Sequence, residues 1–211
     1  MFRTLKLIFA ADSEWEKMSL KPPHPAVVFF VSILPLIVAM LAVEGWGLMN
    51  WGEMSEFGRR NVPAERILKY LLFYGASSIF VIFAGAALLK NVAPSFNLSS
   101  SFGTCFVLMA YGFAPILLMR ALDAIPQINT WVCLAIGCML AMRVLYHGVA
   151  HWLKPEQTKG LGVFMVATIY TVVLGGLVHF ASVQVLKGRF LKNVELPAQA
   201  SELKFRSNTP L

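Results

Sequence analysis

Five long runs of apolar residues constrain the fold of this chain more than any other feature. Each run is close to the ~20 helical residues needed to cross a bilayer. Four carry no charged residue, and the third carries only Arg120, near its end. Because lipid offers no hydrogen-bond partner to an exposed backbone, each run should form an α-helix. The runs lie at 26–43, 70–89, 104–122, 124–142 and 160–186.

The composition also indicates an integral membrane protein. Hydrophobic residues make up 57% of the chain and charged residues only 14%, whereas about a quarter of the residues in soluble domains are charged. The formal net charge is +7. Most basic residues stand at the ends of apolar runs, where Lys and Arg meet lipid headgroups. The expected partner is therefore the lipid bilayer and not nucleic acid.

We predict an all-α fold, a polytopic five-transmembrane-helix bundle with a short amphipathic N-terminal segment. Residues 1–25 would form the interfacial segment, with Trp15 among the lipid headgroups. Residues 26–186 would form the transmembrane domain, and 187–211 a basic polar tail. The predicted helices are about 26–49, 67–89, 104–122, 130–153 and 161–186.

The distribution of Lys and Arg does not decide the membrane orientation. With five spans, seven of the 18 basic residues fall on the N-terminal side and ten on the other, and Arg143 lies within a span. The positive-inside rule needs a clearer excess than this.

Two short motifs resemble the Yip1-domain membrane proteins. One is SEWEKM, residues 13–18, ahead of the first span, and the other is YGFAPILL, residues 111–118, in the third. With a Gly-rich fifth helix, the resemblance covers nearly the whole chain and is nearest to the bacterial branch. It implies a five-helix bundle with a cytoplasmic N-terminus and no shared catalytic chemistry. Eukaryotic relatives are linked to vesicle trafficking through small GTPases, and the long basic tail departs from the pattern.

A polar stripe crosses the fourth predicted helix. Arg143, His147 and His151 stand four residues apart in the stretch RVLYHGVAHW, a spacing that places them on one helix face. Polar residues within membrane spans are candidate functional residues. The stripe is compatible with a metal site, with a path for a ligand or proton, or with the polar end of a helix reaching water.

A metal site needs a third ligand beside the two histidines. His179 lies about 12 residues deeper than His147 when both are counted from the loop at 154–160, or ~18 Å at 1.5 Å per residue. His24 and Glu156 are the other candidates on the correct side. None is firmly placed, so we predict no metal or cofactor.

Other polar groups lie close to the helix ends. Glu44, Arg120 and Asp123 fall near the ends of the first and third helices, where we expect a solvated interface. Arg143 is about 10 residues, or ~15 Å, from the end of its helix. We therefore expect Arg143→Ala to be more damaging than Arg120→Ala.

Two further residue groups point to helix geometry. Pro115 removes a backbone hydrogen bond and should bend the third helix, with Tyr111 one turn before it. Gly175, Gly176 and His179 suggest close packing of the fifth helix, because small residues let membrane helices approach.

The motifs favour a non-enzymatic protein. The chain contains neither G-x-S-x-G nor H-E-x-x-H, and its short loops leave no room for a soluble catalytic domain. The leading hypothesis is an adaptor, a membrane-organising protein or an accessory subunit in the bacterial cytoplasmic (inner) membrane, bound to other membrane proteins or to itself. The alternative is a small transporter or channel for an ion or lipid, with its path along Arg143, His147 and His151. A membrane metalloenzyme is the third possibility.

Overall fold

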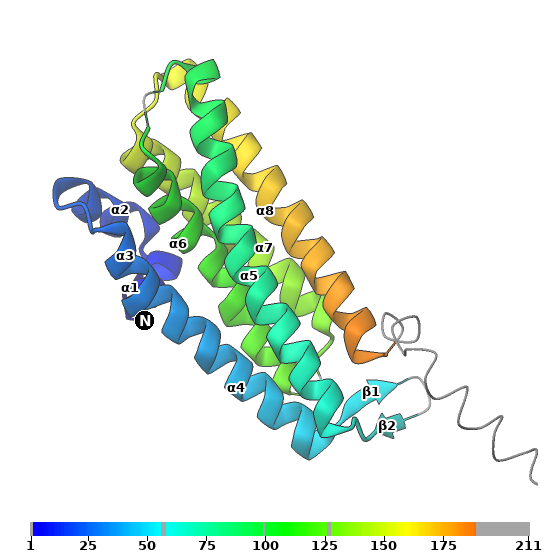
Figure 1. Ribbon diagram of the computed structural model, residues 1–211. Helices are drawn as coiled ribbons and strands as arrows, with labels where there is room; N and C mark the ends of the chain where they lie inside the picture. Colours follow the sequence, from blue (N-terminus) through cyan, green and yellow to red (C-terminus); the bar gives the residue numbers. More distant parts are fainter. Residues whose placement is uncertain (1, 56–57, 99, 126–127, 189–211) are drawn as a thin grey trace, which may run out of the picture.

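The computed structural model describes residues 2–55, 58–98, 100–125 and 128–188 (Figure 1). Five of its helices are long and apolar enough to span a membrane, which confirms the predicted all-α, polytopic fold. These spans are Pro25–Trp51, Ala64–Phe96, Phe102–Ala124, Thr130–Leu153 and Lys159–Leu186. The predicted basic tail lies outside the described residues from position 189 onward.

Most spans combine an α-helix with a short π or 3₁₀ segment. The elements are α1 (Phe2–Phe9), α2 (Ala11–Leu20), α3 (Pro25–Val27), η1 (Val28–Ile33), α4 (Leu34–Trp51), α5 (Ala64–Val92), η2 (Ala93–Phe96), α6 (Phe102–Arg120), η3 (Ala121–Ala124), α7 (Thr130–Gly148), η4 (Val149–Leu153) and α8 (Gln157–Leu186). The strands β1 (Glu53–Ser55) and β2 (Gly58–Arg60) pair antiparallel between α4 and α5.

Helix α6 is the centre of the bundle. Every residue from Cys105 to Leu117 is buried, as expected for a helix that is hydrophobic on all sides. It packs against α4, α5, α7 and α8. It packs tightly on α7, where a Cβ added to Gly112 would lie 2.4 Å from a Leu145 methyl carbon. A larger residue at Gly112 would therefore force the Leu145 side chain to move.

Two prolines within the spans, Pro35 and Pro115, differ in their local structure. Pro35 is the second residue of α4, just after the π-helical turn η1, and wider turns of this kind accommodate a missing backbone donor. Pro115 lies inside α6, which continues as a single α-helix. Tyr111 is buried in the same helix, and a bend at this motif stays a prediction.

The N-terminal helices α1 and α2 fold back against the side of the bundle, where they contact α6, α7 and η4 (Figure 1). Trp15 in α2 is fully buried, its indole Nε1 donates to the backbone oxygen of Val144 at 2.9 Å, and its ring packs edge-on against Tyr111. The expectation that Trp15 lies among lipid headgroups is therefore wrong. The indole instead finds a carbonyl acceptor inside the protein, in a space that Gly148 leaves open.

We expect Gly148→Ala to destabilise the docked N-terminal helices. The added Cβ would lie 2.5 Å from a Leu108 methyl carbon and 2.9 Å from the Trp15 ring. Overpacking of this kind costs about 1–3 kcal/mol. It should lower the midpoint of thermal unfolding and speed trypsin cleavage after Lys17 in α2, because the helix leaves the bundle more often.

Gly176→Ala is the matched control. A Cβ at Gly176 meets no described atom within 4 Å, and Ala is favoured over Gly in a helix by about 1 kcal/mol. Equal thermal midpoints for the two variants would contradict the close packing of Trp15 on Gly148.

Candidate functional site

A cluster of buried polar side chains joins the spans at the end of the bundle opposite to Trp15. Glu44 comes from α4, Tyr70 from α5, Arg120 from the last turn of α6, and His179 from α8. The side chains of Arg120 and Glu44 are each only 5% exposed. Charged groups are costly inside a membrane and are usually paired there, so their mutual contacts decide what this cluster can do.

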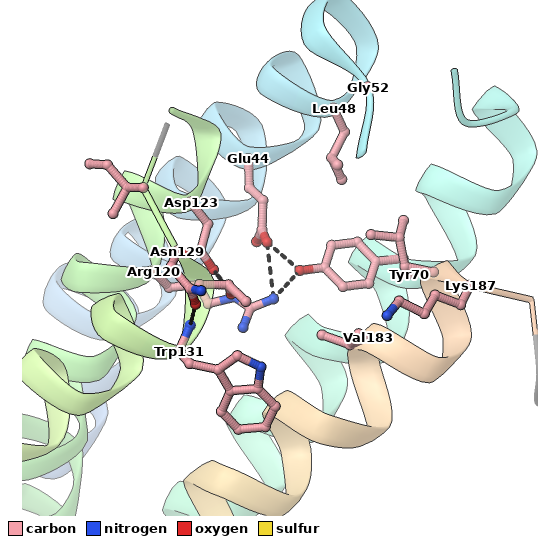
Figure 2. Close-up of a pocket in the computed structure, with 13 residues that line it drawn as sticks. Glu44, Leu48, Gly52, Tyr70, Arg120, Asp123, Asn129, Trp131, Val183 and Lys187 are labelled. Atoms are coloured by element: carbon pink, nitrogen blue, oxygen red, sulfur yellow. Dashed lines mark hydrogen bonds and ion pairs between the residues drawn. The ribbon is translucent and has the colours of Figure 1, made fainter. Parts of the chain in front are cut away.

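The guanidinium of Arg120 is the centre of the cluster (Figure 2). Its Nη2 donates to Glu44 Oε1 at 3.1 Å and to the Tyr70 hydroxyl, which itself donates to the same carboxylate oxygen. Its Nη1 contacts His179 Nδ1. Its Nε lies 3.3 Å from Asp123 Oδ2, within ion-pair distance but without hydrogen-bond alignment. One cation therefore faces two carboxylates.

The fourth span joins the cluster through the first turn of α7. Thr130 in α7 donates its hydroxyl to Asp123 Oδ2 at 2.7 Å and lies 3.4 Å from His179 Nε2. Trp131 packs edge-on against His179, with ring centroids 4.7 Å apart. The Arg120 guanidinium also lies 4.7 Å from the ring centroid of Tyr74, close enough for a cation–π contact. All five spans thus contribute to one network.

A cavity of about 450 Å³ borders this network, and Lys187 and Trp131 lie in its wall (Figure 2). Two carboxylate oxygens of the cluster, Glu44 Oε2 and Asp123 Oδ1, are buried without a hydrogen-bond partner among the described residues. Buried polar atoms are normally satisfied, so these oxygens are available to water or to a donor group that enters the cavity.

The structure reverses the expected roles of the two arginines. Glu44, Arg120 and Asp123 are buried against one another and not solvated, whereas Arg143 is exposed on the outside of the bundle. Arg143 does lie farther from the ends of its span than Arg120, but Arg120 is the arginine buried within the protein, so greater depth does not make Arg143 the more critical residue. Counting residues gives depth along a helix but not the direction in which a side chain points. One feature of the sequence could have indicated this cluster: Glu44, Arg120 and Asp123 all lie at a similar depth in the predicted bundle.

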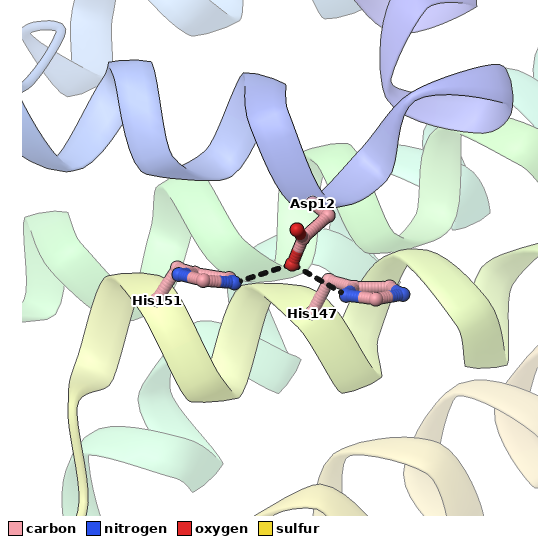
Figure 3. Close-up of side chains that lie close together, drawn as sticks. All are labelled: Asp12, His147 and His151. Carbon is pink, nitrogen blue, oxygen red and sulfur yellow. Dashed lines mark hydrogen bonds and ion pairs between the residues drawn. The ribbon is translucent and has the colours of Figure 1, made fainter.

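The polar stripe contacts the N-terminal helices (Figure 3). The Nη2 of Arg143 lies 3.4 Å from the backbone oxygen of Phe9 at the end of α1. His147 Nδ1 and His151 Nε2 lie 3.2 and 2.6 Å from the same oxygen of Asp12 in α2. The hydrogen bond from His151 lowers the pKa of Asp12. The sequence alone did not point to Asp12 as a third ligand, because only the fold-back of α1 and α2 brings it next to His147 and His151.

The predicted packing residues of α8 face different surroundings. His179 is 1% exposed and belongs to the Arg120 cluster. A Cβ on Gly175 would make ordinary contact with Ile116 at 3.5 Å, whereas one on Gly176 would meet no described atom within 4 Å. Gly175 therefore faces α6, and the packing role predicted for Gly176 finds no contact among the described residues.

We expect Arg120→Ala to be far more damaging than Arg143→Ala. Removing one partner of a buried ion pair leaves an uncompensated charge and costs about 3–5 kcal/mol, whereas an exposed charge contributes about 0–1 kcal/mol. The yield of folded protein in membranes and the thermal midpoint in detergent micelles measure the difference. Equal loss in both variants would contradict the assigned role of Arg120.

Comparison with protein-family models identifies a Yip1 domain over residues 5–180. No match was found among curated proteins or among solved structures. The matched region includes the SEWEKM and YGFAPILL motifs, helix α2, all residues of the polar stripe and the Arg120 cluster. Because the match covers most of the chain, this protein belongs to the Yip1 domain family.

Proposed function

We propose that this Yip1 domain protein is a non-enzymatic adaptor, membrane-organising protein or accessory subunit in the bacterial cytoplasmic (inner) membrane. The observation that carries the proposal is the network around Arg120, which holds all five spans together at one end. A bundle fixed in this way presents a constant outer surface. Such a surface suits the binding of another membrane protein or of a second copy.

The interior of the bundle supports this function over transport. The transport hypothesis drawn from the sequence requires a polar passage lined by Arg143, His147 and His151. Their side chains instead contact α1 and α2. Between the stripe and the Arg120 cluster lies the buried run of α6 from Cys105 to Leu117, which is apolar apart from Tyr111 and the glycine backbone. This packing favours a static role.

The outer surface offers large apolar side chains for a partner. Trp46 and Met49 in α4 are 57% and 65% exposed and lie close in sequence to Glu44. Trp46 also packs edge-on against Trp51. Aromatic residues are enriched at the centres of protein interfaces. We therefore expect a partner membrane helix to bind the face of α4 that carries Trp46.

Photo-crosslinking in native membranes tests the proposal. A photoreactive side chain at Trp46 should yield one dominant protein adduct, and the same adduct should co-purify in stoichiometric amounts after gentle solubilisation. A photoreactive side chain at Phe80, 66% exposed near the middle of α5, serves as the comparison position for lipid contact.

Proteoliposomes test the transport alternative in parallel. We expect no flux of protons or monovalent cations above that of empty liposomes. A flux that is lost in Glu44→Gln, together with the absence of a protein adduct at Trp46, would overturn the adaptor function and assign transport to the cavity beside Arg120.

A further inference from the structure

The polar stripe forms a second cluster with Asp12, on the opposite end of the bundle from Arg120. We propose that Asp12, His147 and His151 bind a first-row divalent cation such as Zn²⁺, which fastens α2 to α7 and η4. This inference is independent of the adaptor function and rests on the arrangement of three ligand atoms (Figure 3).

The two histidines present their ring nitrogens from one face of a continuous helix. His147 lies in the last turn of α7 and His151 in the π-helical turn η4 that follows. Both rings converge on a single oxygen of Asp12, with Nδ1 of His147 at 3.2 Å and Nε2 of His151 at 2.6 Å. The carboxylate comes from a separate helix, so a shared ion would join segments about 135 residues apart.

The ligand types and spacings match those of a transition-metal site. Two imidazoles and one carboxylate, with a position left open, are a common donor set for Zn²⁺ and for Fe²⁺. The three ligand atoms lie within 4.8 Å of one another. A zinc ion needs ligands at about 2.0–2.2 Å, which corresponds to about 3.4 Å between neighbouring ligand atoms. Small side-chain rotations therefore produce the site.

The protein holds Asp12 in place before any ion binds. Trp15, one turn along α2, is fully buried and hydrogen-bonded to Val144. Arg143, one turn before His147, contacts the end of α1 at Phe9. Fixing the ligands in advance reduces the conformational entropy lost on binding. The site is thus held by contacts that do not themselves ligate the ion.

The cluster is open to solvent on one side. The side chain of Asp12 is 68% exposed, and those of His147 and His151 are 27% and 34% exposed. An ion can therefore enter from the aqueous phase and keep a water molecule in its fourth position. Because the ion would bind only when α2 is docked, binding should stabilise the docked state by mass action.

The number of zinc ions bound per chain tests the proposal directly. The full-length protein, purified in detergent with a histidine-free affinity tag, is stripped with chelator and dialysed against Zn²⁺. We expect about one zinc per wild-type chain and a raised thermal midpoint. Asp12→Asn should weaken binding at least tenfold, and the double variant His147→Gln, His151→Gln should abolish it. His24→Gln, which alters a histidine outside the cluster, should retain one zinc.

A spectroscopic measurement on the wild-type protein tests the proposal even if the variants fail to fold. Co²⁺ in place of Zn²⁺ should give visible absorption bands of a four-coordinate site, and Zn²⁺ should remove them. The proposal is overturned if the wild-type chain takes up no stoichiometric metal and shows no such bands. It is equally overturned if the folded double variant keeps the same zinc content, because Asp12, His147 and His151 then form only a hydrogen-bonded cluster.

Discussion

A cation buried inside an apolar bundle must be neutralised by groups close to it. In this protein the cation is Arg120, and the groups around it come from all five spans. Neither lipid nor the packed core can solvate a guanidinium, so carboxylates and neutral acceptors have to surround it. Glu44, Tyr70 and His179 contact it directly, and Asp123 is held beside it by Thr130. The positions of the five helices at this end are therefore fixed relative to one guanidinium group.

The other end of the bundle is organised by Trp15 and the polar stripe. The two motifs on which the sequence resemblance rests meet there, because Trp15 of SEWEKM packs edge-on against Tyr111 of YGFAPILL. On the outer side of α1 and α2, Arg143 contacts the end of α1, and the two histidines, His147 and His151, contact Asp12 in α2. The stripe that looked like a transport path thus fastens the N-terminal helices, and the apolar centre of α6 separates it from Arg120.

Hydropathy predicts the five spans because length and polarity decide membrane insertion before any helix finds its neighbours. Counting depth also places His179 far from His147, and His179 lies with Arg120. What the sequence could not predict depends on tertiary contacts. The inward direction of Arg120 follows from the rotation of α6, and the position of Asp12 follows from the fold-back of α2. Neither leaves a periodic signal in the sequence.

A double-mutant cycle between Arg120 and Glu44 tests the central claim most directly. The free energy of unfolding is measured in detergent micelles for Arg120→Met, Glu44→Gln and the double variant, with the exposed Lys69–Glu65 pair as the control. We predict a coupling of about 2–3 kcal/mol for the buried pair and at most about 0.5 kcal/mol for the exposed pair. Additive effects of the Arg120 and Glu44 substitutions would contradict the account.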